Sequence, residues 1–198
     1  MSGFLKKART MRNRAGKLKR RRYRALPLCL QRVAGLGRLE LNGRLANPAR
    51  VSQGKSMKID IERFGLKNVP IDPDTLFTFA KGIVGFENCK RFKLFHEEGK
   101  ATVFWLQSVD DTAVMFPIVA PEALDIEYQI ELSDADCALI GLQSVEDVAV
   151  VLIVYRDEAE SGKIAANTRS PVILNLKSRK GMQKVLQDVH PSLLYRAR

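Results

Sequence analysis

Paired acidic residues are the first feature of this sequence that could carry out chemistry. Asp110 and Asp111 end the stretch LQSVDD, and Glu146 and Asp147 end a second copy, LQSVED, further along the chain. Two carboxylates can hold a metal ion, or act as acid and base across a glycosidic bond, only where both point at one place. Adjacent residues of an extended chain point to opposite faces, which argues against both sites. The duplication instead indicates a corner that the chain turns twice.

No other group of residues has the pattern of a known catalytic or cofactor site. His96 and His190 are the only two histidines, and neither lies beside a Cys or Ser in a recognisable nucleophile motif. The three cysteines form no C-x-x-C pair, so neither a zinc site nor a disulfide framework is indicated. We therefore expect no enzyme activity, no cofactor and no metal, and a reducing cytoplasm as the location.

Charge divides the chain into two unlike parts. Residues 1–56 hold 16 of the 33 Lys and Arg residues and a single acid, whereas residues 57–198 hold 17 basic and 21 acidic residues, a net charge of −4. The basic block from Lys17 to Arg24 repels itself and lacks a periodic apolar face, which predicts disorder. Met57 begins an alternating strand pattern at once. We expect Met57 to be the natural start and residues 1–56 to be a disordered or non-native extension.

An RNA-binding arm is the alternative interpretation of this basic segment. Each phosphate that a protein neutralises on single-stranded RNA makes the slope of log affinity against log salt concentration steeper by about 0.7. The acidic remainder would repel phosphates, so we expect no direct nucleic-acid contact from residues 57–198. The longest apolar run, VAVVLIVY, has eight residues, against about 20 for a membrane-spanning helix. We therefore expect no membrane partner.

From residue 57 onward, short alternating stretches separated by Gly, Pro and Asp are typical of an all-β protein. A short helix is predicted after Ser133, because Asp136 completes a capping box with it. We predict a small antiparallel β-barrel-like domain with one or two short helices, since closure hides the edges of a sheet. The strands are expected within residues 58–64, 66–71, 72–79, 91–97, 101–109, 125–132, 148–155, 164–169, 171–177 and 182–188.

Aromatic residues at alternate strand positions usually pack inward, so we expect most of the aromatic residues in these strands to lie in the core rather than to stack on nucleic-acid bases. These are Phe77, Phe79, Phe104, Trp105 and Phe116. The exception is Phe86, which follows the stretch KGIVG in a predicted loop. Its two glycines indicate a turn with positive φ, because no helix follows that would make a phosphate-binding loop. An aromatic residue there either contacts a partner or closes the end of the barrel.

The chain resembles the FliW family of bacterial flagellar assembly factors over about residues 57–190, in five stretches that occur in order. They are KIDIERFG, FTFAKGIVGFENCKRFKLF, FWLQSVDDTAVMFPIVAP, VEDVAVVLIVY and ANTRSPVILNLKSRKGMQKVL. The resemblance implies a β-barrel-like protein that binds flagellin before its export and, when flagellin leaves, the translational repressor CsrA. One departure is Val84, which stands where the family usually has proline.

Loop residues of this resemblance are the expected partner contacts. They are Phe86, Glu87, Gln107, Asp110, Asp111, Pro121 and Glu122. CsrA binds RNA and so presents basic surface, which an acidic partner complements. Turn structure is the favoured interpretation for Gln107 and Asp111, because the second copy, with Gln143 and Asp147, needs the same corner. Asp110 is the better candidate for contact with a cation of CsrA.

Overall fold

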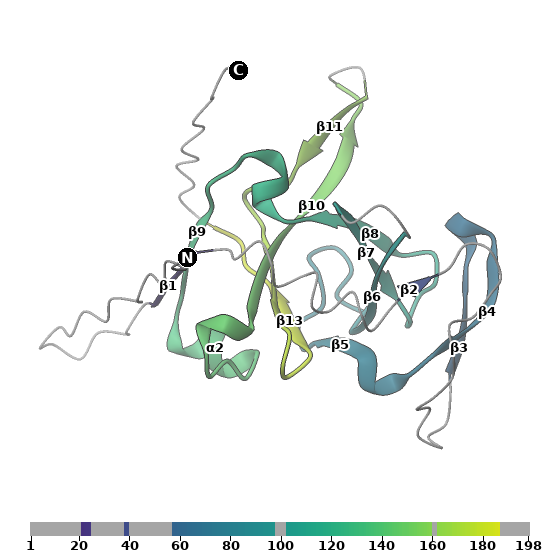
Figure 1. Ribbon diagram of the computed structural model, residues 1–198, viewed down its shortest axis with the longest axis horizontal. Coiled ribbons are helices and arrows are strands. Elements are labelled where there is room, and N and C mark those ends of the chain that lie inside the picture. The colour runs from purple at the N-terminus through teal and green to yellow at the C-terminus, as the bar shows by residue number, and fades with distance from the viewer. Residues whose placement is uncertain (1–20, 25–37, 40–56, 98–101, 160–161, 187–198) are drawn as a thin grey trace, which may run out of the picture.

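Short alternating stretches form strands throughout the residues that the computed structural model describes, 21–24, 38–39, 57–97, 102–159 and 162–186 (Figure 1). The strands are β1 (Arg21–Arg24), β2 (Arg38–Leu39), β3 (Met57–Ile61), β4 (Leu66–Ile71), β5 (Leu76–Phe79), β6 (Arg91–Glu97), β7 (Val103–Ser108), β8 (Met115–Val119), β9 (Gln129–Leu132), β10 (Val148–Asp157), β11 (Lys163–Ala166), β12 (Val172–Asn175) and β13 (Lys180–Gln183). The helical elements of this part of the chain are α2 (Asp134–Leu139) and the 3-10 turns η1 (Glu62–Phe64), η2 (Pro73–Thr75), η3 (Pro121–Leu124) and η4 (Val145–Asp147).

Seven strands close into a barrel in the order β10, β12, β13, β5, β6, β7 and β8, with β8 returning to β10. The closing pairs join Leu152 to Val119 and Ile153 to Ile118. All neighbours in this ring are antiparallel except β13 and β5, which run parallel. Closure gives each strand of the ring a strand neighbour on both sides, and β11 and β2 pair in addition with β10 and β6. The predicted all-β, barrel-like fold is confirmed.

The barrel interior is filled by large apolar side chains that alternate along its strands. Phe77, Phe79 and Phe92 are completely buried there and pack with Leu106 and Ile118. Gly181 faces this cluster, and a Cβ built on it would lie 2.4 Å from the Phe79 ring. The glycine in β13 therefore makes room for the aromatic ring of the neighbouring strand. The predicted inward packing is confirmed for Phe77, Phe79 and Phe104, whereas Phe116 is only partly buried and Trp105 is buried in a different cluster, under β3 and β4.

A second apolar cluster lies where β9 and α2 cover the barrel. Tyr128, Ile130 and Leu132 alternate inward and pack against β10, as the period-2 pattern predicts. The predicted capping box is present: the Ser133 hydroxyl accepts from the Asp136 N–H, and the Asp136 carboxylate accepts from the Ser133 N–H. The helix therefore begins where the sequence indicates.

The hairpin of β3 and β4 packs on the opposite side of the barrel (Figure 1). Its buried Ile59, Ile61 and Ile71 contact a cluster that includes Trp105. The Arg63 guanidinium lies 4.8 Å from the centroid of the Trp105 ring and covers the outer face of the indole. Among the described residues, no helix is both long and apolar enough to cross a membrane.

Two short pieces of the basic N-terminal segment are strands, which differs from the disorder expected there. β1 pairs antiparallel with β9, and β2 pairs parallel with β6. A strand added to an exposed edge needs only backbone N–H and C=O groups, so residues without an apolar face can form one. The rest of residues 1–56 lies outside the described residues, and Met57 as the natural start remains a prediction.

Candidate partner-binding site

The loop of residues 80–90 joins β5 to β6 and has a tightly turned backbone. Gly82 and Gly85 have φ angles of +74° and +82°, as predicted from the stretch KGIVG. The Phe86 N–H donates to the Ile83 carbonyl at 2.7 Å and closes the turn. A Cβ on Gly82 would lie 2.7 Å from the Cα of Glu87, so the two arms of the loop nearly touch. Only glycine fits at that position.

Two apolar side chains at the tip of this loop face solvent. Val84 is 62% exposed and Phe86 is 41% exposed. The other face of the Phe86 ring packs edge to face on Phe116, with 5.0 Å between ring centroids. The ring is therefore partly packed on the barrel and partly exposed, and contact of Phe86 with a partner stays a prediction.

Side-chain acceptors hold the loop tip in this shape. The Val84 N–H donates to Gln183 Oε1 on β13 at 2.9 Å, and the Gly85 N–H donates to Glu87 Oε1 at 2.8 Å. The hydrogen bond from the Gly85 N–H lowers the pKa of Glu87 below its usual value. The sequence pattern did not single out Gln183, because a polar residue in a strand carries no signal for a distant loop. The exposed apolar side chains thus stand on a pinned backbone.

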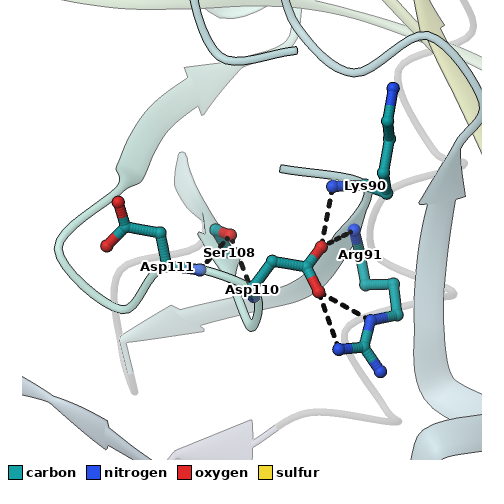
Figure 2. A network of polar contacts seen from close by, with 5 residues as sticks. All are labelled: Lys90, Arg91, Ser108, Asp110 and Asp111. Atoms are coloured by element: carbon teal, nitrogen blue, oxygen red, sulfur yellow. Dashed lines mark hydrogen bonds and ion pairs between the residues drawn. The ribbon is translucent and has the colours of Figure 1, made fainter. Parts of the chain in front are cut away.

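The Asp110 carboxylate fastens the far end of the same loop (Figure 2). Its Oδ2 accepts from the backbone N–H groups of Lys90 and Arg91, both at 2.7 Å. Its Oδ1 accepts from Arg91 Nε and lies 2.7 Å from Arg91 Nη2. Asp110 thus pairs with a cation of its own chain, Arg91, and contact with a cation of CsrA stays a prediction. The carboxylate therefore connects the acidic corner to the start of β6.

Asp110 and Asp111 do not converge, as their adjacent positions predict. Figure 2 shows the Asp111 carboxylate turned away from the Asp110 network. The Ser108 hydroxyl accepts from the N–H groups of both residues, at 3.2 and 3.1 Å. In the second copy, the Ser144 hydroxyl accepts from the Glu146 N–H at 3.4 Å. Both copies form a turn, and serine is the element they share.

Gln107 is only 1% exposed and lies inside the corner. Its Nε2 donates to the carbonyl oxygens of Ser108 and Thr112, both at 2.9 Å, and of Val114 at 3.2 Å. Gln143, its counterpart in the second copy, is exposed. The structure thus gives Gln107 the role of supporting the corner and leaves it almost no surface for a partner.

Gln107→Leu is expected to lower the free energy of unfolding by about 1 to 2 kcal/mol, because three carbonyl oxygens lose their shared donor. Gln143→Leu makes the same change at an exposed position and is expected to stay within about 0.5 kcal/mol of the wild type. Urea unfolding of the two variants measures the difference. Equal stabilities would show that the buried amide does not support the corner.

Pro121 and Glu122 lie apart from the loop. They begin η3 after β8, whereas the corner and Phe116 lie toward the start of β8, roughly 15 Å away at 3.3 Å per residue. Pro121 is buried, and Glu122 Oε2 is buried without a hydrogen-bond partner. The structure therefore gathers Phe86, Glu87, Asp110 and Asp111 at one end of the barrel and places these two residues away from them.

The arrangement presents a surface at this loop. In the part of the chain that the structure describes, no three His, Cys, Asp or Glu side chains gather in a way that could hold a metal ion. The acidic groups at the corner are used in hydrogen bonds to backbone and in one ion pair. We call the exposed side chains of Val84 and Phe86, on this pinned loop, the tip surface.

Comparison with known proteins points to one family. A sequence model described as FliW protein matches residues 58–196. The chain is similar to the flagellar assembly factor FliW of Azoarcus sp. (strain BH72), with 41% identity over 72% of this chain and 99% of that protein. The FliW of Chromobacterium violaceum is 39% identical over 65% of this chain and 92% of its own. A crystal structure of the flagellar assembly factor FliW matches with a TM-score of 0.60 and 26% identity, over 68% of this chain and 92% of that one.

Proposed function

Because the chain belongs to the FliW family of flagellar assembly factors, we propose that it binds flagellin and the translational repressor CsrA in the cytoplasm. The two partners exclude one another, so flagellin bound to the factor leaves CsrA free to silence its message. Such a switch needs no catalysis, only two ligands whose effects on each other are reciprocal. The chain thus acts as a flagellin chaperone and a CsrA antagonist.

The tip surface is the observation that carries this proposal. Val84 and Phe86 are exposed, yet the hydrogen bonds to Gln183 and Glu87 hold the backbone beneath them. An apolar surface held in one shape loses little conformational freedom when a partner covers it. An aromatic residue among such contacts often contributes a large share of the binding energy. We therefore place the first protein contact at this loop.

The charge of the barrel part supports the second partner. Residues 57–198 carry a net charge of −4 although the whole chain is basic. An RNA-binding repressor presents basic surface, and opposite potentials raise the rate of encounter and suppress wrong partners. Binding to CsrA is therefore expected to weaken as salt rises, whereas an apolar contact at the tip surface is expected to respond little.

Competition between the two purified partners tests the proposal. The full chain is immobilised and loaded with labelled CsrA, and flagellin is then titrated. Release of CsrA with rising flagellin is the expected result. Failure of both proteins to bind would overturn the proposal, and binding of both at once would overturn the exclusion between them.

Phe86→Ala is expected to weaken binding to at least one of the two partners about tenfold, because truncation removes the aromatic side chain of the tip surface. Tyr155→Ala removes another exposed aromatic ring, on β10, and is the control expected to leave both affinities unchanged. Isothermal titration with each partner measures the effect. Unchanged affinity of Phe86→Ala for both partners would remove the tip surface from the interface.

RNA binding through residues 1–56 is the second candidate function, supported by their 16 basic residues and one acid. Single-stranded RNA titrated at several salt concentrations distinguishes the two candidates. If the arm binds RNA, log affinity falls steeply with log salt, by about 0.7 for each phosphate contacted. The same titration with CsrA or flagellin in place of RNA tests the leading candidate independently.

A further inference from the structure

β9 has one strand neighbour among the described residues, and that neighbour comes from the basic N-terminal segment. The pairing is antiparallel and four residues long, from Arg21 opposite Leu132 to Arg24 opposite Gln129. Side chains hold β9 to the barrel, because Ile130 and Leu132 of the strand, and Tyr128 just before it, are buried in the apolar cluster under it. Its backbone edge is therefore a place where an extended chain can add a strand.

The sequence around β9 is strongly acidic. Residues 122–136 hold six Asp and Glu and no Lys or Arg, whereas β1 reads RRYR. One of the six, Asp136, already forms an ion pair with Lys184. The register places Arg22 directly opposite Glu131. Opposite charges across a strand pair stabilise it, and like charges would oppose it. The edge is thus suited to an extended segment rich in Arg or Lys.

β1 is small enough to be exchanged. A ladder of four residue pairs at a single edge is marginal without further packing. Any basic extended segment can make the same backbone hydrogen bonds, because those bonds do not depend on side-chain identity. Covalent attachment gives β1 a high effective concentration that a free competitor must exceed.

We propose that the β9 edge is a docking site for a basic, extended segment of a partner protein, and that Arg21–Arg24 occupies it as an intramolecular competitor. The N-terminal segment then regulates access to the edge instead of serving only as an extension of the chain. The site lies on β9, on a different element from the tip surface, and does not depend on which protein binds there. Its test therefore stays separate from that of the proposed function.

The test uses the full chain and a fluorescent peptide with the sequence of residues 19–26, KRRRYRAL. In one variant, Arg22→Pro and Tyr23→Pro together block pairing, because alternate residues of a strand direct their N–H groups toward the neighbour. The matched control carries Arg22→Gln and Tyr23→Phe, which removes the same charge but keeps both N–H groups. A second peptide, N-methylated at the positions of Arg22 and Tyr23, keeps its charge and loses two donors.

The proline variant is expected to bind the peptide at least tenfold more tightly than the wild type and the matched control, as measured by fluorescence anisotropy. Adding Glu131→Lys to the proline variant should remove this binding. Adding Glu158→Lys, at an exposed position just after β10, should not. Equal affinity of all chains, no binding by any, or equal binding of the N-methylated peptide would overturn the proposal. A dimer of the wild type that the prolines abolish would instead assign the edge to a second copy and overturn occupation within one chain.

Discussion

Asp110→Ala is expected to lower the free energy of unfolding by about 2 to 3 kcal/mol at neutral pH. The change leaves the backbone N–H groups of Lys90 and Arg91 without their acceptor and breaks the ion pair to the Arg91 guanidinium. Half of the Arg91 side chain is exposed, so the ion pair itself contributes little and the two backbone hydrogen bonds most of the effect. Urea unfolding at pH 7 measures the loss.

This difference between wild type and variant is expected to shrink in acid. Partial burial of Asp110 acts to raise its pKa, but the hydrogen bonds from Lys90 and Arg91 and the guanidinium charge together hold the pKa below its usual value. A carboxyl whose pKa is depressed by folding contributes stability above the unfolded pKa of about 3.9 and loses it as pH falls through the folded value. The difference in free energy of unfolding between wild type and Asp110→Ala should therefore be constant above about pH 5 and decrease below about pH 4.

Asp111→Ala is the matched control, because the neighbouring carboxylate accepts a single hydrogen bond, from the Ala113 N–H. Asp111→Ala is expected to lower the free energy of unfolding by about 1 kcal/mol or less. Equal losses for the two variants, or a gap for Asp110→Ala that persists unchanged at pH 3, would contradict the role of Asp110 as the acceptor between the corner and β6. Partner titrations of the same variants then show whether the loop must be fastened for binding.

Local patterns in the sequence predicted individual elements well. The period of two placed β9 and its buried face, and Ser133 with Asp136 marked the start of α2. These features depend on neighbours within a few residues. The order of strands depends on distant residues: the parallel contact of β13 with β5 joins Gly181 to Phe79, about a hundred residues apart. Nothing local in either strand specifies that pairing.

The candidate site shows the same division. Gly82 and Gly85 indicated the turn from the sequence, because a positive φ angle is a local property of a residue. The two copies of LQSV predicted two corners, but Gln107 is buried and Gln143 is exposed although their neighbours in sequence are the same. Whether a corner residue is buried depends on which other parts of the chain pack over it. The sequence of the corner itself gives no information about those parts. The sequence did not predict the strand at Arg21–Arg24 for a related reason. The segment has no alternating apolar pattern, and it forms a strand because it pairs with the edge of β9.

Gly82→Ala is expected to have the largest effect, a loss of about 2 to 4 kcal/mol in the free energy of unfolding. A side chain at φ of +74° is strained by roughly 1 to 2 kcal/mol. The added Cβ would also lie 2.7 Å from Glu87 Cα and 2.9 Å from the carbonyl oxygens of Phe86 and Glu87. These are backbone atoms, so relief requires the segment that carries Phe86 to move. Chemical denaturation measures the stability, and titration with flagellin and CsrA measures binding.

Gly85→Ala separates strain from collision, because Gly85 has a similar φ of +82° but nothing within 4 Å of the position of its Cβ. It should lose only the strain, about 1 to 2 kcal/mol. The remaining difference between the two variants is the cost of displacing residues 86 and 87. If the tip surface is the contact, folded Gly82→Ala protein binds its partner at least as weakly as Phe86→Ala, whereas Gly85→Ala retains more affinity. Equal stability and equal affinity of the two glycine variants would mean that the close approach at Gly82 does not determine the shape of the loop.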